Sequence, residues 1–319
     1  MKFATISHLL DEKNIDCIPK SWIQDDIIVS PELDVKGSKG YVIALKHLPL
    51  EIIGFSRDKI RQHILKTALY ARHDLNVDII QLGALTTSVT SGGEWLAQQK
   101  EYTGYVTHGD SYTAAVTCQA VTKALHLHNK KASDQTIAIV GAYGVIGEAV
   151  SKLLVPEFNH SILIGRRNEK LEELTTKITG DFETTTELKT NNADVLVTAT
   201  SHPTALLTSD HLKKNAIIID VSQPANVHTS VCQMRPDIVR IDGGFVEFPK
   251  NNPIPIPGLP VGKNYACFAE VMMQALEHEK QNHVGAIDIT YLKKTETLGK
   301  KYGFILKELT NFGRPILQM

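Results

Sequence analysis

The segment "TIAIVGAYGVIGEAVSKLL", residues 136–154, restricts the fold more than any other part of the sequence. An apolar run of strand length leads directly into a glycine turn, and a helix pattern follows. Glycines allow the tight turn, and the helix N-terminus offers free N–H groups to a pyrophosphate. The strand before and the helix after are the context that such a site requires. We therefore predict a dinucleotide-binding turn formed by Gly141, Tyr143, Gly144, Val145, Ile146 and Gly147.

Strand and helix patterns alternate on both sides of this turn, which predicts an α/β protein. After the turn, four apolar runs have the rhythm of a doubly wound nucleotide-binding sheet: "SILIGRR", "ADVLVTATS", "AIIIDVS" and "IVRIDGG". Before it, "KFATIS" and "KGYVIAL" predict strands, and residues 56–74 predict an amphipathic helix. Two helices, "YACFAEVMMQALEHE" and "ITYLKKTETLGKKYG", follow a proline-rich loop, and Gly303 is expected to end the second.

A chain of 319 residues suits two or three domains. We expect an N-terminal α/β substrate domain over 1–130, ended by the polar link "NKKASDQ". A Rossmann-type domain with a doubly wound parallel sheet is expected over 131–250. Residues 251–319 are expected to form a C-terminal helical segment that carries Cys267.

Composition narrows the class of protein. The net charge is -1, so no global basic field indicates nucleic acid or an anionic membrane as a partner. No apolar run approaches the roughly 20 residues that a membrane span needs, and charges interrupt the start of the chain too early for a signal peptide. The four cysteines lie far apart without a metal-ligand spacing, so we expect cytoplasmic thiols and no metal. The oligomeric state is left open.

The strand after the glycine turn indicates the type of dinucleotide. NAD sites usually have an acidic residue about 20 residues beyond the turn, where it binds the ribose 2′-hydroxyl. Here Gly165 occupies that region, and Arg166, which is 166 − 141 = 25 residues beyond Gly141, is followed by Arg167. Guanidinium groups pair with a 2′-phosphate and stack on adenine. The sequence therefore favours NADPH as the cofactor.

Cys267 stands in the first turn of the helix that follows the proline-rich loop. On a helical wheel it falls with Gln274 and His278, away from the centre of the apolar stripe around Met272. A free cysteine is usually a small buried hydrophobe. The position off the stripe and the helix N-terminus, which lowers a thiol pKa, indicate a reactive group instead.

A reactive thiol beside a nicotinamide cofactor suggests attack on an acyl thioester, then reduction of the acyl-enzyme to an aldehyde. Periodicity and spacing favour this covalent reaction and ordinary alcohol or ketone dehydrogenation equally. Thr200 and Ser222 end neighbouring strands and should border the nicotinamide. His202, Tyr112 and His108 are candidate acids, although the sequence favours a loop or capping role for each. Asp110 is expected to be a helix cap.

Several motifs, in the same order, resemble the cyanobacterial long-chain acyl-[acyl-carrier-protein] reductases, which form fatty aldehydes. They are "LGALTTS", "THGDSYTAA", "GAYGVIGEAV", "LIGRRNEKLEEL", "ADVLVTATSHP", "IDGGFVE", "FAEVMMQALE" and "ETLGKKYGF". The resemblance implies NADPH-dependent reduction of a carrier- or CoA-bound acyl thioester, with Cys267 as the acylated nucleophile. It also implies a fold of three parts, with the pyrophosphate at Gly141, Gly144 and Gly147.

The chain departs from this family around the expected substrate cleft. Residues before 40 match poorly, and Tyr112 stands where the family's motif carries histidine. The segments "DVSQPAN" and "NNPIPIPGLPVG" also differ in their glycine and proline content. A shorter acyl group or an aminoacyl thioester therefore stays open as the substrate. The alternatives to thioester reduction are an NADP-dependent alcohol- or amine-type dehydrogenase without covalent catalysis, and a non-catalytic NADP-binding sensor.

Overall fold

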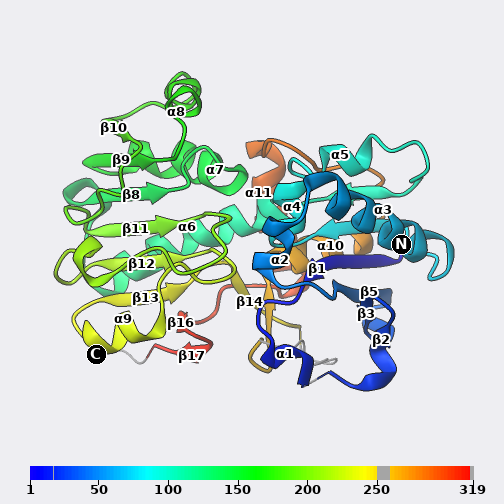
Figure 1. Cartoon of the computed structure of the whole chain (residues 1–319). Coiled ribbons are helices and arrows are strands. Elements are labelled where there is room, and N and C mark those ends of the chain that lie inside the picture. The colour runs from blue at the N-terminus through cyan, green and yellow to red at the C-terminus, as the bar shows by residue number, and fades with distance from the viewer. Residues whose placement is uncertain (17, 250–258, 317–319) are drawn as a thin grey trace. The chain divides into compact units, whose positions relative to one another are not determined.

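The computed structural model describes residues 1–16, 18–249 and 259–316. The chain forms two compact units, the first of Met1–Tyr112 with Val246–Ile305 and the second of Thr113–Phe245 with Leu306–Met319 (Figure 1). Each unit contains a sheet with parallel strands, so the predicted α/β class is confirmed. Cys17 and most of the proline-rich loop lie outside the described residues.

The first unit is built on a seven-stranded sheet in the order β2-β3-β5-β1-β6-β7, with β4 also paired to β5. Its central strands β5, β1, β6 and β7 are parallel, and the short strands β2, β3 and β4 join in antiparallel fashion. The two predicted N-terminal strands correspond to β1 and β5. The short antiparallel strands were not predicted, because two or three residues show no alternation. The strands are β1 (Phe3–His8), β2 (Ile23–Gln24), β3 (Ile27–Val29), β4 (Leu33–Val35), β5 (Ser38–Leu45), β6 (Ile79–Leu82) and β7 (Tyr105–Thr107).

Helices of the first unit pack against β1. The predicted amphipathic helix is α3, and its residues Ile60, Ile64 and Ala68 share a core cluster with Ala4 and Ile6 of β1. Helix α10 contacts β1 and β6 and also packs against α11, which ends at Gly303 as predicted. The helices are α1 (Lys13–Asp16), α2 (Pro49–Gly54), α3 (Arg57–His73), α4 (Leu85–Val89), α5 (Glu94–Ala97), α10 (Ala266–Leu276) and α11 (Ile289–Tyr302).

The second unit contains a six-stranded sheet whose strands are all parallel, in the order β10-β9-β8-β11-β12-β13. Numbered from β8, this order is 3-2-1-4-5-6, the arrangement of doubly wound dinucleotide-binding sheets. The strand order reverses between β8 and β11, where such sheets bind their ligand (Figure 1). The strands are β8 (Thr136–Val140), β9 (His160–Ile164), β10 (Phe182–Thr185), β11 (Val195–Thr198), β12 (Ile217–Asp220) and β13 (Val239–Asp242).

Helix α6 begins in the first unit and continues into the second. The described structure also contains two small two-stranded sheets, one of β14 with β15 and one of β16 with β17. The remaining elements are α6 (Asp110–Leu127), α7 (Val145–Leu154), α8 (Asn168–Thr175), α9 (Thr229–Met234), β14 (Phe245–Glu247), β15 (Lys263–Tyr265), β16 (Thr310–Asn311) and β17 (Arg314–Pro315).

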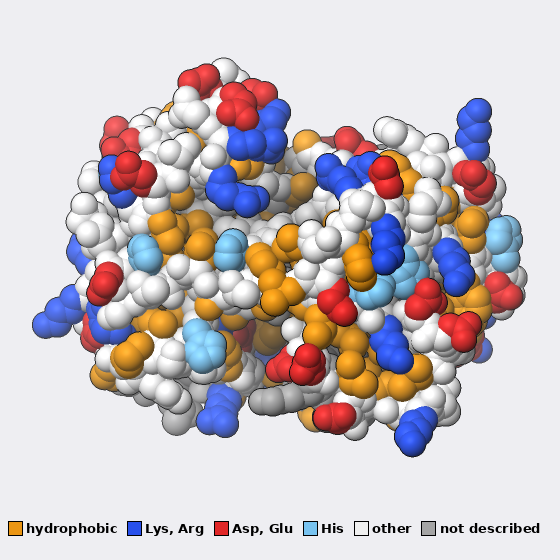
Figure 2. Space-filling view, viewed as in Figure 1, with side chains coloured by type: hydrophobic (Ala, Val, Ile, Leu, Met, Phe, Trp, Pro, Cys, Tyr) orange, Lys and Arg blue, Asp and Glu red, His pale blue; other side chains and the backbone are white. Residues whose placement is uncertain are grey.

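The surface mixes charges of both signs. On the face seen in Figure 2, Lys and Arg side chains are interspersed with Asp and Glu. Among the residues that the structure describes, no helix is both long enough and apolar enough to cross a bilayer.

A buried charge network fixes the last strands of the second unit. The guanidinium of Arg240 on β13 donates to Asp220 at 3.2 Å and to Asp242 at 2.5 Å. Asp242 also accepts hydrogen bonds from the hydroxyl of Thr310 at 2.7 Å and the N–H of Gly313 at 2.8 Å. All three charged side chains are buried, so each depends on the others for compensation.

Replacing Arg240 with leucine should lower the free energy of unfolding by roughly 3–5 kcal/mol, because two buried carboxylates lose their cation. Urea unfolding of purified variants measures the change. Lys189→Met is the control, since its ion pair with Glu187 is solvent-exposed and should contribute little. Equal losses in the two variants would contradict the role given to the network.

Candidate active site

The predicted glycine turn lies between β8 and α7. Gly141 has φ of +88°, and a Cβ atom there would collide with the carbonyl oxygen of Ala199. Gly144 precedes the helix without a side-chain cap, so the first N–H groups of α7 have no side chain to accept their hydrogen bonds. These N–H groups, with the positive end of the helix dipole, suit a pyrophosphate. The turn therefore fits a dinucleotide, and its first-turn donors are Val145, Ile146 and Gly147.

The strand β9 leads into a basic segment against which Tyr143 lies. The Tyr143 hydroxyl accepts a hydrogen bond from the N–H of Arg166 at 3.1 Å, and the Arg167 guanidinium lies 5.5 Å from the Tyr143 ring centroid. A Cβ atom at Gly165 would collide with that ring, so the position tolerates no acidic side chain without displacing Tyr143. Both arginines are exposed at the carboxyl end of β9, where a phosphate can reach them.

The ends of β11 and β12 meet, as the sequence predicts for parallel neighbours. The N–H of Thr200 donates to the hydroxyl oxygen of Ser222 at 3.0 Å. Both hydroxyls donate to the side-chain oxygen of Asn226, at 2.7 Å from Thr200 and 2.9 Å from Ser222. Asn226 is fully buried and its side-chain nitrogen has no partner among the described residues. Asn226 was not predicted from the sequence, since an asparagine in a loop carries no periodic signal.

His202 lies in the second unit and is partly exposed. Its Nδ1 lies 2.9 Å from the carbonyl oxygen of Thr204, and its N–H donates to the hydroxyl of Thr200 at 3.2 Å. These contacts are those of a loop residue, so His202 borders the predicted cofactor residues without a contact that assigns it a proton transfer.

Cys267 belongs to the first unit and lies in the first turn of α10, as predicted. Its backbone packs closely on the turn between β7 and α6. Gly109 has φ of +72°, and a Cβ atom there would come within 2.6 Å of the Cys267 carbonyl oxygen. This close approach places the segment His108–Asp110 directly beside the cysteine.

The expectation that Cys267 lies on a solvent-facing polar side of its helix is wrong, because Glu270 and Gln274 on that side are buried. The carboxylate of Glu270 accepts hydrogen bonds from the hydroxyl of Thr107 at 2.8 Å and the N–H of Tyr112 at 2.7 Å. It therefore satisfies the N-terminus of α6, a role expected of Asp110. A helical wheel treats the polar side as solvent-facing, but here another loop of the same unit covers it.

The electrostatics at Cys267 also differ from expectation. Burial raises the pKa of the Cys267 thiol, and the carboxyl groups of Asp110 and Glu270 raise it further. The predicted lowering by the helix N-terminus is therefore wrong, since desolvation and two nearby acids outweigh it. Burial likewise raises the pKa of Asp110 and raises that of Glu270 to about 7.

His108 is buried and neutral. Burial, with a smaller effect of His283, lowers its pKa to about 3. Its Nδ1 accepts a hydrogen bond from the N–H of Asp110 at 2.8 Å, so the ring proton is on Nε2.

Tyr112 is placed as a packing residue. It is 2% exposed, and its hydroxyl donates to the carbonyl oxygen of Phe304. Burial raises its pKa further above the ordinary value. Its hydroxyl is therefore committed to the backbone near the end of α11. Thr86 and Thr87 similarly donate to backbone carbonyls, at 2.8 Å to Gly83 and 2.6 Å to Leu82.

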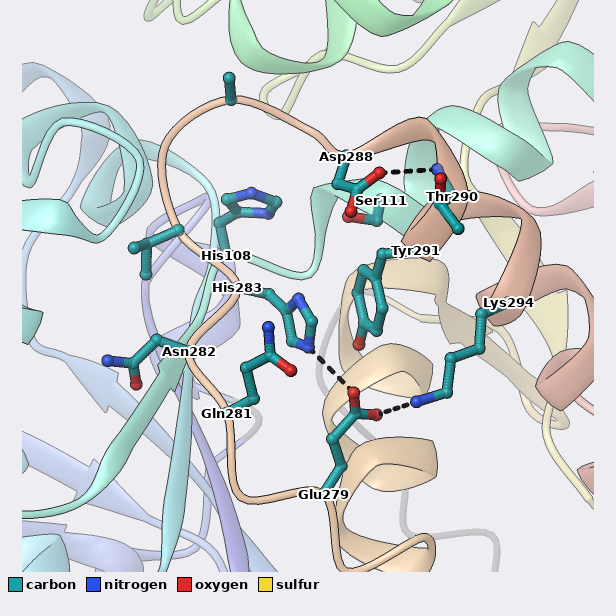
Figure 3. Close-up of a pocket in the computed structure, with 12 residues that line it drawn as sticks. His108, Ser111, Glu279, Gln281, Asn282, His283, Asp288, Thr290, Tyr291 and Lys294 are labelled. Carbon is teal, nitrogen blue, oxygen red and sulfur yellow. Dashed lines mark hydrogen bonds and ion pairs between the residues drawn. The ribbon is translucent and has the colours of Figure 1, made fainter.

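A pocket of about 360 Å³ opens beside the His108 turn. Twelve residues line it, from the turn at His108 and Ser111, from the segment that joins α10 to α11, and from the first turns of α11 (Figure 3). The rings of His283 and Tyr291 stack with centroids 3.4 Å apart. Glu279 contacts His283 Nε2 at 3.3 Å and the Lys294 ammonium at 2.9 Å. This pocket was not predicted from the sequence, because its polar residues follow no motif.

Comparison with known proteins supports the cofactor more strongly than the substrate. Residues 123–242 match the shikimate/quinate 5-dehydrogenase family. Over 304 residues the chain is 25% identical to a long-chain acyl-[acyl-carrier-protein] reductase of Synechococcus elongatus, covering 89% of this chain and 88% of that protein.

Two further similarities are more limited. The chain is 25% identical to the aminotransferase PigE of a Serratia species over 252 residues, which covers 75% of this chain but 29% of that protein. Among solved structures, L-tryptophan dehydrogenase from Nostoc punctiforme covers 96% of this chain and 80% of its own, with 12% identity and a TM-score of 0.45.

The chain therefore has an NAD(P)-binding fold of the oxidoreductase type. This follows from the parallel sheet, the glycine turn at its switch point and the match over 123–242. The similarity to an acyl-carrier-protein reductase extends through both units.

The raised pKa of Glu270 predicts how stability depends on pH. Its pKa rises from 4.5 to about 7 on folding, so the folded state binds the proton more tightly. This contribution is complete below about pH 4.5 and is lost as pH rises through about 7, by up to about 3 kcal/mol. Urea unfolding between pH 4.5 and 8 should show a smaller decline in Glu270→Gln than in the wild type. Identical slopes would exclude a titrating Glu270.

Proposed function

We propose that the protein is an NADPH-dependent reductase that converts an acyl thioester into an aldehyde through an acyl group carried on Cys267. The observation that carries this proposal is the setting of Cys267: a first-turn thiol packed on the Gly109 turn, with Asp110 and Glu270 close enough to perturb it. The similarity to a reductase whose name specifies acyl-carrier-protein substrates supports it. CoA and an acyl-carrier protein are both possible thiol carriers.

Covalent catalysis divides the reaction into two steps. The Cys267 sulfur attacks the carbonyl carbon of the thioester, the bond to the carrier sulfur breaks, and the carrier leaves as a thiol. NADPH, when bound, supplies the hydride that reduces the acyl group, which leaves Cys267 as the aldehyde.

Proton movement in this proposal involves the acids beside the thiol. Because the pKa of Cys267 is raised, the resting group is a neutral thiol that must lose its proton during the attack. Asp110 adjoins Gly109 and is 14% exposed, so it can exchange that proton with solvent. Glu270, with a pKa of about 7, changes the local charge beside the thiol as the pH passes through about 7.

The cofactor is proposed to be NADPH rather than NADH. The exposed guanidinium groups of Arg166 and Arg167 are the proposed partners of the 2′-phosphate. The Tyr143 ring occupies the space above Gly165, which leaves no acid to bind a free 2′-hydroxyl. Thr200 and Ser222 are proposed to border the nicotinamide.

Cys267→Ser tests the covalent step. Intact-protein mass spectrometry after mixing the wild type with acyl thioesters, without NADPH, should show an added acyl group at Cys267. The serine variant should show no adduct and should lose aldehyde formation by at least roughly a thousandfold. Cys118→Ser and Cys232→Ser are controls that should keep both.

The same experiment separates the alternatives. Full activity of Cys267→Ser would support an alcohol- or amine-type dehydrogenase without covalent catalysis. Binding of NADPH without its consumption, across thioesters and aldehydes, would support a sensor.

Replacing Arg166 and Arg167 together with glutamine should raise the Kd for NADPH by roughly 10–100-fold, because charge-assisted hydrogen bonds to the phosphate are lost. The Kd for NADH should change little. Lys170→Gln in α8 is the matched control, since its ammonium pairs with Glu173. Fluorescence titration measures these constants, and parallel losses for both cofactors would reject phosphate recognition.

A further inference from the structure

The polar pocket lies beside the His108–Asp110 turn, which packs on the backbone of Cys267. His108 and Ser111 line the pocket, and between them in sequence lies Gly109, where a Cβ atom would come within 2.6 Å of the Cys267 carbonyl oxygen. The other lining residues come from the segment after α10, the helix that carries Cys267 in its first turn, and from the start of α11 (Figure 3). The pocket and Cys267 therefore adjoin the same turn, His108–Ser111.

The lining is unsuited to a long alkyl chain. Of the twelve residues, Val284 and Ala286 are the only aliphatic ones. The volume of about 360 Å³ is at the small end for ligand sites. A fatty chain would remove water from carboxylates, amides and imidazoles without offering them any hydrogen bond, which is unfavourable.

The charges in the pocket favour a cation. Burial lowers the pKa of both His108 and His283, so both rings are neutral near pH 7. The formal charges are then two carboxylates, Glu279 and Asp288, and one ammonium, Lys294. Lys294 already pairs with Glu279. Asp288 accepts from the N–H of Thr290 at 2.7 Å, and in the described part of the chain it has no ion-pair partner.

We propose that this pocket receives the acyl group of the substrate and selects a short acyl group that carries an ammonium, paired with Asp288 beside Glu279. The inference rests on the proposed function, and it replaces a fatty acyl substrate with an aminoacyl thioester. The amine is a donor that the acceptors of the lining can satisfy, and its charge balances the second carboxylate.

Matched pairs of N-acetylcysteamine thioesters test this selection. Alanyl and isobutyryl thioesters differ by an ammonium in place of a methyl group, as do β-alanyl and butyryl thioesters. The rate at which each acylates Cys267 is followed by intact-protein mass spectrometry without NADPH. We expect the amine-bearing member of each pair to react at least about tenfold faster, and faster than a palmitoyl thioester.

Asp288→Asn is the decisive variant, because asparagine keeps the helix N-cap while it removes the charge. It should reduce the ratio within each pair to near one. Asp58→Asn, the control, changes the same charge in the first turn of α3, outside the pocket lining, and should keep the ratio. A preference for the alkyl or palmitoyl thioester would overturn the pocket assignment and leave the proposed function standing.

A second measurement covers the case in which no thioester acylates Cys267, which would reject the proposed function. Alaninamide and isobutyramide are then titrated against the wild type and Asp288→Asn, with NMR shifts as the readout. Stronger binding of alaninamide that is lost in Asp288→Asn would support the pocket. Equal binding of the two amides would overturn it.

Discussion

The buried carboxylate of Glu270 is the interaction on which the arrangement around Cys267 depends. It joins α10 to the end of β7 through Thr107 and to the start of α6 through the N–H of Tyr112. Because a buried carboxylate needs such donors, the α10 helix and the His108–Asp110 turn must pack together. Gly109 makes that contact possible, since any side chain there would meet the backbone of Cys267.

This arrangement gives the thiol unusual surroundings. Burial, and after it the nearby acids, raise the pKa of the thiol, so its reactivity would be governed by a proton that leaves during the reaction. The same turn also forms one wall of a polar pocket. The proposed nucleophile and the pocket therefore adjoin the same turn, and under the proposed function a change in the turn would alter both reactivity and substrate choice.

Local patterns predicted where the glycine turn lies and which strand ends meet. The glycine turn, the pair of arginines and the polar ends of β11 and β12 are all features of short segments, and parallel strands bring their ends to one edge. Asn226, which ties Thr200 to Ser222, was not predictable because its position depends on how a loop folds back. The packing of Tyr112 was not predictable for a similar reason, since its hydroxyl partner at Phe304 is 192 residues away in sequence.

The sequence by itself determined the α/β class, the cofactor turn, the place of Cys267 at a helix start and the end of α11 at Gly303. Each of these follows from spacing within about twenty residues, where backbone geometry dictates the pattern. Tertiary structure alone decided that the polar side of α10 is buried, that Glu270 rather than Asp110 caps α6, and that the thiol pKa rises. These three outcomes depend on which distant segments cover the helix and exclude water from it. The sequence pattern of one helix does not show which segments those are.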